Sequence, residues 1–252
     1  GKLFKPRDAK LFKPRNSLGN TGGQFYTAKN PEYGAVFTYN LNNVPKTSKS
    51  LRMQRERTLN TDNKDIPFPG YDKLSEEMNE KSASIILTIK DSEGNHIRNV
   101  KKNASNGSSR IAWNLRHQSY YPIRAGRGQA NSWFNPSGPY VTPGEYHAEI
   151  YLENNGSVEK LDGPIAFNVN PLRKGTLEGA SYSDYNSFRT RVSNLYISMS
   201  KYQDEFNMMK SKIELLDKAS LQLETFSPEI MKKISDFKAK YNAFDSEIGS
   251  NP

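Results

Sequence analysis

The sequence contains no cysteine and only three histidines, His96, His117 and His147. The absence of cysteine excludes disulfides, thiolate zinc sites, iron–sulfur clusters and cysteine nucleophiles. No two histidines have the spacing of a metal-binding motif, so we expect surface histidines, no metal site and no cofactor. No apolar run approaches the ~20 residues of a membrane-spanning helix. Glycine-rich phosphate loops, dinucleotide fingerprints and serine-nucleophile motifs are also missing, and we expect no catalytic residues and no enzyme activity.

The positive charge of the chain is confined to its first quarter. The formal net charge is +9, and residues 1–60 hold 12 basic and 3 acidic side chains, whereas residues 61–252 hold 24 of each. A basic segment can bind phosphates through counterion release, lie free in solvent or pack on an acidic neighbour. Because no groove-reading motif follows it, a nucleic-acid partner is not favoured.

Residues 1–27 form a basic leader that contains a short repeat. Leu3-Phe4-Lys5-Pro6-Arg7 recurs as Leu11-Phe12-Lys13-Pro14-Arg15. Lysine before proline favours extended or polyproline backbone in each copy, and two copies are too few for a solenoid. We therefore expect an extended leader and linker. The chain opens on Gly1 without a signal segment, so we expect a processed product or a piece of a longer protein.

Residues 28–172 carry the pattern of short strands joined by turns. In 35–41 the apolar residues alternate with polar ones, which is typical of a strand with one buried face. The same reasoning predicts strands at 84–90, 96–100, 109–116, 145–152 and 164–169, with Gly- or Asn-containing turns between several of them. In this scheme residues 46–59 are a short exposed helix, and residues 71–79 are a short helix or a loop. Short strands separated by turns predict a β-sandwich.

Residues 173–252 change to a helical period. Apolar side chains recur at alternating spacings of four and three over 188–216 and again over 230–248, and Ser227-Pro228-Glu229 is typical of a helix start. We expect helices at about 184–217 and 228–248, folded into an antiparallel helical hairpin. The shorter helix cannot cover the whole longer one, so the sandwich, another domain or another copy should cover the rest. We call the residues expected to dock there the docking seam: Phe188, Val192, Leu195, Met199, Phe206 and Met209.

The irregular stretch 117–140 is rich in aromatic and arginine side chains. Loops on a rigid scaffold often bind ligands, exposed aromatic rings stack on sugars, and an arginine beside an aromatic residue can anchor a protein partner. The same side chains can instead fold back over the sandwich edge or the helices, and we favour that arrangement or an interdomain contact. The possible ligand or partner contacts are Tyr120, Tyr121, Arg124, Arg127, Trp133 and Phe134.

A set of motifs links the chain to a known family. They are Pro31-Glu32-Tyr33-Gly34-Ala35-Val36-Phe37-Thr38-Tyr39, Ile86-Leu87-Thr88-Ile89, Arg110-Ile111-Ala112-Trp113-Asn114-Leu115-Arg116 and Gly138-Pro139-Tyr140-Val141-Thr142-Pro143-Gly144-Glu145-Tyr146. Together they resemble the C-terminal part of large bacterial sortilin-like (VPS10-type) BNR-repeat proteins, often labelled glycosyl hydrolases. In that family a β-propeller precedes an Ig-like sandwich and a helical tail.

The resemblance implies a segregated α+β fold, an Ig-like antiparallel β-sandwich followed by a helical hairpin. It also implies an exported bacterial protein in the periplasm, at the cell surface or outside the cell. Any catalytic site of the family would lie on the propeller, whose repeats are absent here, and Asn114 stands where the family usually has Asp. We therefore expect a non-catalytic structural and interaction region that packs on a β-propeller or an envelope assembly. The alternative is a carbohydrate-binding accessory module with a glycan as ligand.

Overall fold

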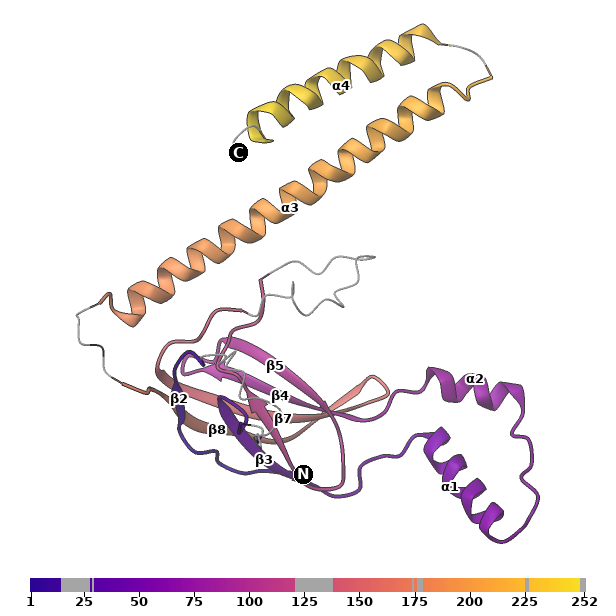
Figure 1. Cartoon of the computed structure of the whole chain (residues 1–252), viewed down its shortest axis with the longest axis vertical. Helices are drawn as coiled ribbons and strands as arrows, with labels where there is room; N and C mark the ends of the chain where they lie inside the picture. The colour runs from indigo at the N-terminus through magenta and orange to yellow at the C-terminus, as the bar shows by residue number, and fades with distance from the viewer. Residues whose placement is uncertain are drawn as a thin grey trace, which may run out of the picture. The chain divides into compact units, whose positions relative to one another are not determined.

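The computed structural model describes residues 1–14, 28, 30–120, 138–173, 175, 179–224 and 227–249 (Figure 1). Within these residues the chain is α+β, with two sheets and four helices. The chain forms two compact units. The first contains the strands together with helices α1 and α2, and the second contains helix α4 and most of helix α3.

The strands of the first unit are β1 (Lys2–Leu3), β2 (Ala9–Leu11), β3 (Ala35–Leu41), β4 (Ser84–Asp91), β5 (His96–Asn103), β6 (Gly107–Trp113), β7 (Gly144–Asn154) and β8 (Ser157–Pro171). The three-stranded sheet has the order β1-β3-β6 and is antiparallel. The five-stranded sheet has the order β2-β8-β7-β4-β5 and is mixed, because β2 runs parallel to β8. The strands predicted within 28–172 pair antiparallel, whereas the parallel pair involves β2, which lies in the segment predicted to be only an extended leader and linker.

Most strands lie where their alternation predicts them. Along β3, Ala35, Phe37, Tyr39 and Leu41 are buried and the residues between them are partly exposed. Several strands extend past the predicted bounds, as β5 does to Asn103, and two further differences stand out. β8 begins at Ser157, well before the expected position 164, and β6 ends at Trp113. The early end of β6 has a local cause, because Leu115 takes a left-handed φ of 55°, which regular strand pairing does not accommodate.

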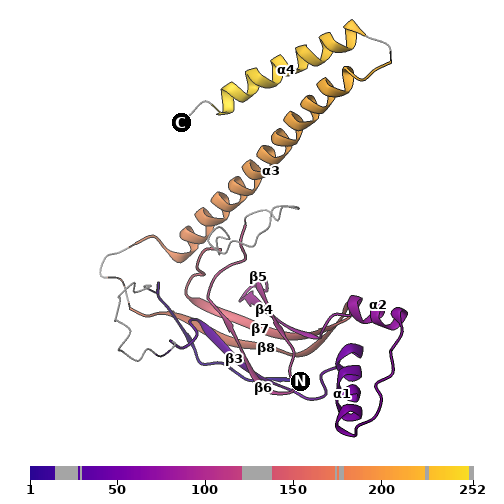
Figure 2. The same cartoon turned by 45° about the vertical axis from the view of Figure 1, so that its right-hand side comes forward.

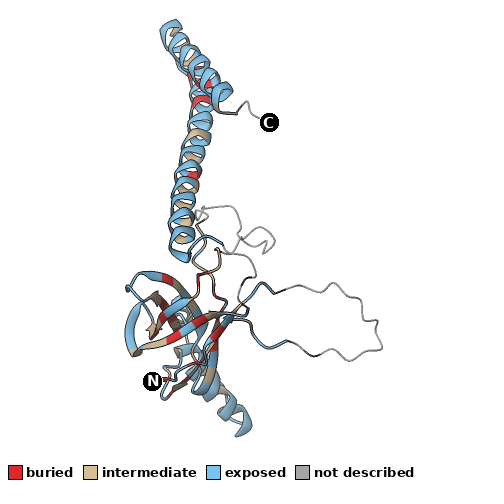
Figure 3. Ribbon diagram, turned by 90° about the vertical axis from the view of Figure 1, so that its left-hand side faces the viewer, coloured by how far each residue is buried: buried red, intermediate tan, exposed pale blue. Residues whose placement is uncertain are grey.

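Both sheets contribute to one hydrophobic core. Trp113 of β6 lies with its ring centroid 5.5 Å from Tyr146 and 6.1 Å from Phe167, which belong to the other sheet. Phe37 of β3 meets Phe167 edge to face at 5.1 Å. Figure 3 shows the buried segments concentrated in the strands. Burying each such side chain contributes about 1.5–3 kcal/mol, so this core is the main source of stability in the first unit.

The start of the leader is part of this core. Leu3 and Ala9 are buried, and they lie in β1 and β2, at the edges of different sheets. The backbone N–H of Leu3 also donates to Oδ2 of Asp162 at 2.8 Å. The two copies of the repeat thus have different positions, with Leu3 in the three-stranded sheet and Leu11 in the five-stranded one.

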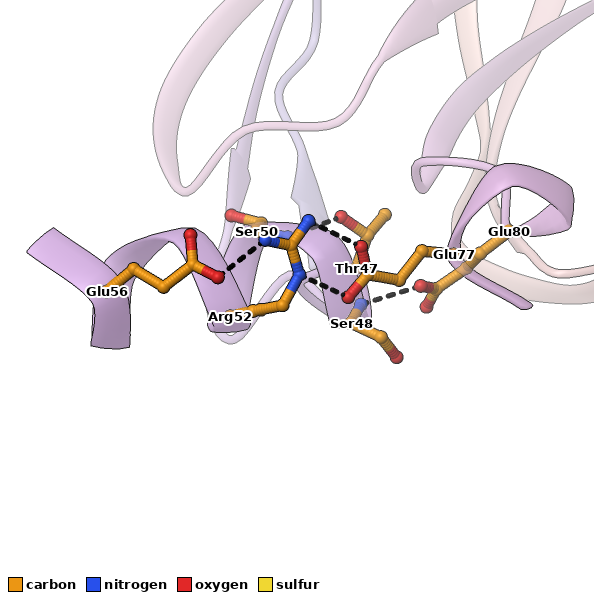
Figure 4. A network of polar contacts seen from close by, with 7 residues as sticks. All are labelled: Thr47, Ser48, Ser50, Arg52, Glu56, Glu77 and Glu80. Atoms are coloured by element: carbon orange, nitrogen blue, oxygen red, sulfur yellow. Dashed lines mark hydrogen bonds and ion pairs between the residues drawn. The ribbon is translucent and has the colours of Figure 1, made fainter. Parts of the chain in front are cut away.

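Helices α1 (Ser48–Thr61) and α2 (Tyr71–Asn79) lie between β3 and β4 in sequence and have no buried residue. Polar contacts connect them (Figure 4). The guanidinium of Arg52 donates from Nε and Nη2 to the two carboxylate oxygens of Glu77, each at 2.8 Å, and from Nη1 to Glu56. The backbone N–H of Ser48 donates to Glu80 at 2.6 Å. Figure 2 shows the two helices next to each other and apart from the strands.

The second unit is built on α3 (Tyr182–Ser220) and α4 (Pro228–Gly249). Both helices occur where the spacing predicts them, and α4 begins at Pro228 as expected. The ring of Phe206 stacks on Tyr241 at 4.3 Å and lies 5.7 Å from Phe244. Lys238 Nζ lies 3.9 Å from Asp217. These contacts join α4 to the C-terminal half of α3.

Candidate functional site

The docking seam is largely exposed to solvent. The exposed fractions are 64% for Phe188, 46% for Val192, 62% for Leu195 and 62% for Met199. Met209 is also exposed, whereas Phe206 is half-buried against the rings of α4. Figure 3 shows α3 and α4 mostly in the colour of exposed residues. The structure therefore places the six predicted residues along one helix and leaves most of them without apolar cover.

A groove of about 490 Å³ lies where α4 meets α3. It contains three residues of the docking seam, Met199, Phe206 and Met209, together with Phe244 of α4. Gln203 and Glu205 complete the lining with Tyr202. The groove is thus an apolar trough with a polar rim, a form that suits an apolar side chain of a partner better than a charged ligand.

The charge on α3 is unevenly distributed. Between residues 185 and 203 the charged side chains are Arg189, Arg191 and Lys201, with no acidic residue. From Asp204 onward acidic and basic residues alternate more evenly. Beside the exposed N-terminal half of the docking seam lie Arg189 and Arg191, with Asp184 one turn before Phe188 and Glu205 in the groove at Met199.

The less exposed residues of this half of α3 lie on another side of the helix. Ser200 is buried, and Ser193 and Tyr196 are partly buried. The ring of Tyr120 lies 6.3 Å from Tyr196 in an edge arrangement. Tyr120 is the one described residue among the six predicted loop contacts. Tyr121, Arg124, Arg127, Trp133 and Phe134 lie outside the described residues.

A charged network in the first unit escaped the sequence prediction. Glu149 of β7 is only 6% exposed, and its carboxylate accepts from Lys160 at 2.7 Å, from Lys90 at 2.8 Å and from the hydroxyl of Tyr151 at 2.8 Å. The hydrogen bond from Lys160, then that from Lys90, lowers the pKa of Glu149 to about 2. The charge between the buried residues Ala148 and Ile150 was the signal available in the sequence. The network is saturated with partners, so it stabilises the sheet and offers no free acid or base.

No helix in the described part of the chain is both long enough and apolar enough to cross a membrane. Among the described residues, His, Asp and Glu side chains form no group of three that could hold a metal ion. The histidines lie apart, with His96 bonded to Asn99 and His147 near Glu145. The candidate functional site is therefore the surface of α3.

No protein-family model matches the chain, and a search of curated proteins finds no significant relative.

Proposed function

We propose that the chain is a non-catalytic structural and interaction region of a larger exported bacterial protein, and that it packs on a β-propeller or an envelope assembly. In this proposal the first unit is an Ig-like β-sandwich and the second an antiparallel helical hairpin. The motifs that resemble sortilin-like BNR-repeat proteins support the setting. The exposed docking seam is the single observation that carries the function.

The docking seam has an energetic reason to be covered. Phe188, Val192, Leu195 and Met199 follow one another along one side of a helix, and each is close to half exposed or more. Removing such a side chain from water yields about 1.5–3 kcal/mol, and contiguous exposed apolar surface marks an interaction site. Among the described residues, the ring contacts of α4 involve Phe206, and of these four residues Met199 alone lines the groove that contains Phe244.

The occupant that fits best is an amphipathic α-helix of a partner protein with an acidic flank. The four-three spacing of the docking seam matches the holes that a second helix offers, whereas a flat sheet or a sugar has no such repeat. Arg189 and Arg191 lie beside the exposed half, and complementary charge on a partner would favour association and fix its direction.

The test places a photo-crosslinking amino acid at position 199 of the full chain, expressed in the bacterium that produces it. We expect a crosslink to an acidic helical segment of a propeller-bearing or envelope protein, identified by mass spectrometry of the linked peptides. Leu195→Glu should abolish that crosslink, because it puts a charge into the apolar contact. Asn194→Glu is the matched control, since Asn194 is also exposed but lies outside the seam, and it should leave the crosslink intact.

Three results would overturn the proposal or a part of it. Crosslinks only to a second copy of the chain, with a dimer in light scattering that Leu195→Glu dissociates, would make the docking seam a self-association surface. Crosslinks only within the chain would show that the seam is covered internally. Recovery of the protein solely in the cytoplasmic fraction would refute the exported setting.

A further inference from the structure

Arg98 and Arg116 lie near each other at one end of the first unit, and among the described residues neither has an ion-pair partner. Arg98 lies on β5 opposite Ile89, and Arg116 follows the end of β6. The backbone N–H of Gln118 donates to the carbonyl of Ile97 at 3.1 Å, which brings the two segments together. Both side chains are half-buried. Burial and then the charge of Arg116 lower the pKa of Arg98, as expected for like charges that lie close together.

The backbone directs Arg98 inward. A register shift between Ile89 and Lys90 leaves Ile97 as an extra residue, and Arg98 therefore shares the face of its partner Ile89, which is fully buried. Leu115 has a φ of 55° and is also fully buried, so a strained turn sends its side chain into the core just before Arg116. A non-glycine residue in this conformation costs about 1 kcal/mol or more and often occurs at functional sites.

Each arginine is oriented through one terminal nitrogen. Nη1 of Arg98 donates to Oδ1 of Asn114 at 3.2 Å. Nη1 of Arg116 donates to the carbonyl of Gly138 at 2.9 Å, and its guanidinium lies 3.7 Å from the ring centre of Tyr140. In the described part of the chain these bonds leave the Nε–Nη2 edge of both arginines unused. That edge is the one that pairs with two oxygens of a carboxylate or phosphate.

In the described part of the chain, no acidic side chain pairs with these two arginines. The segments 15–29 and 121–137 contain no Asp or Glu at all. Two half-buried cations without a counterion repel each other, and a bound anion would remove that repulsion while using both free edges.

We propose that Arg98 and Arg116 together bind one oxyanion, a carboxylate or phosphate group of a ligand, with Asn114 and Tyr140 as positioning residues. The site belongs to the first unit and does not depend on the docking seam. A purely structural alternative exists, because an inward-pointing charge on an edge strand such as β5 protects the edge from pairing with other chains. Protection of the strand edge requires no anion, so a measurement of anion binding distinguishes the two roles.

The experiment titrates the full chain with sodium phosphate and with sodium acetate at constant ionic strength, with sodium chloride as the reference, using calorimetry and thermal unfolding. We expect saturable binding of at least one oxyanion and a rise in unfolding temperature that chloride does not give. Saturation with phosphate identifies a phosphate group as the ligand, and saturation with acetate identifies a carboxylate.

Two variants and one control decide the assignment. Arg98→Gln should raise Kd at least about tenfold, because one charged hydrogen-bonded pair is lost. Asn114→Asp should have the same effect while raising the unfolding temperature without added anion, since an internal carboxylate then lies beside Arg98. Arg110→Gln, an exposed arginine of β6, should bind as the parent does. Equal responses to chloride and both oxyanions, or unchanged binding in Asn114→Asp, would overturn the proposal.

Discussion

Single side chains in this protein matter most where a charge or a close backbone contact is enclosed by the sheets. Glu149 is the clearest charged example, since two lysines and a tyrosine surround its carboxylate. Gly34 is the clearest steric one, because a Cβ built there would lie 1.9 Å from the carbonyl oxygen of Trp113. Substitution of either residue should therefore destabilise the first unit.

Glu149→Gln should lower the free energy of unfolding at pH 7 by about 1–2 kcal/mol, because two lysines lose their charged acceptor. The folded pKa is about 2 and the ordinary value is 4.5, so the stabilisation is present above pH 4.5 and is lost as pH falls toward 2. Urea unfolding at pH 7, 4.5 and 2.5 should show the difference between parent and variant shrinking over that range. Glu159→Gln, an exposed position on β8, should show neither effect.

Gly34→Ala should destabilise the first unit by more than about 3 kcal/mol, since it combines a φ of 111° with an overlap against Trp113 that neither strand can relieve. Gly94→Ala is the control, because Gly94 has a similar φ of 86° but open space around it. It should cost only about 1 kcal/mol, the strain of the backbone alone. Similar losses for both variants in chemical denaturation would show that the overlap is relieved.

At the level of helices, apolar spacing predicts where a helix forms better than what covers it. The bounds of α3 and α4 follow from the four-three repeat and from the Ser-Pro-Glu start. The repeat does not show that Phe206 meets the rings of α4 while Phe188, at an equivalent position, remains exposed. That distinction depends on helix length and on the turn between the helices.

Phe206→Ala should loosen α4 from α3, because it removes one stacked and one tilted ring contact. We expect hydrogen exchange in α4 to become at least tenfold faster in the full chain, which corresponds to about 1.4 kcal/mol or more of local stability. Phe188→Ala removes the same atoms from an exposed site and should leave exchange in α4 unchanged. Equal acceleration in both variants would contradict the assignment of the helix contact to Phe206.

Across the whole molecule, alternation predicts the central strands and fails at long-range pairs. β3 and β4 follow directly from their apolar pattern. β1 and β2 are too short to show a pattern, and their burial depends on partners far along the chain. The sequence also does not show that Arg98 points inward. Simple alternation assigns Arg98 to the outer face of β5, and the bulge at Ile97 moves it to the inner face.

Deletion of residues 1–11 should lower the unfolding midpoint of the first unit, because it removes β1 and β2 and exposes core side chains that contact Leu3 and Ala9. Replacing Lys5, Lys10 and Lys13 together by Gln should change the free energy of unfolding by no more than about 0.5 kcal/mol, since these lysines are exposed. Thermal unfolding of both variants makes the comparison. A larger loss in the lysine variant would mean that the charge of the leader, and not its burial, stabilises the unit.

The pairing of β2 with β8 also orders events during synthesis. Ala9 pairs with Val169, and the N–H of Leu3 bonds to Asp162, so Leu3 and Ala9 leave the ribosome about 160 residues before their partners. At roughly 5–20 residues per second the wait is about 10–30 s. Throughout that time β2 has no strand to pair with, and the core side chains that later cover Leu3 and Ala9 are incomplete. Completion of β8 is therefore the event that closes this unit.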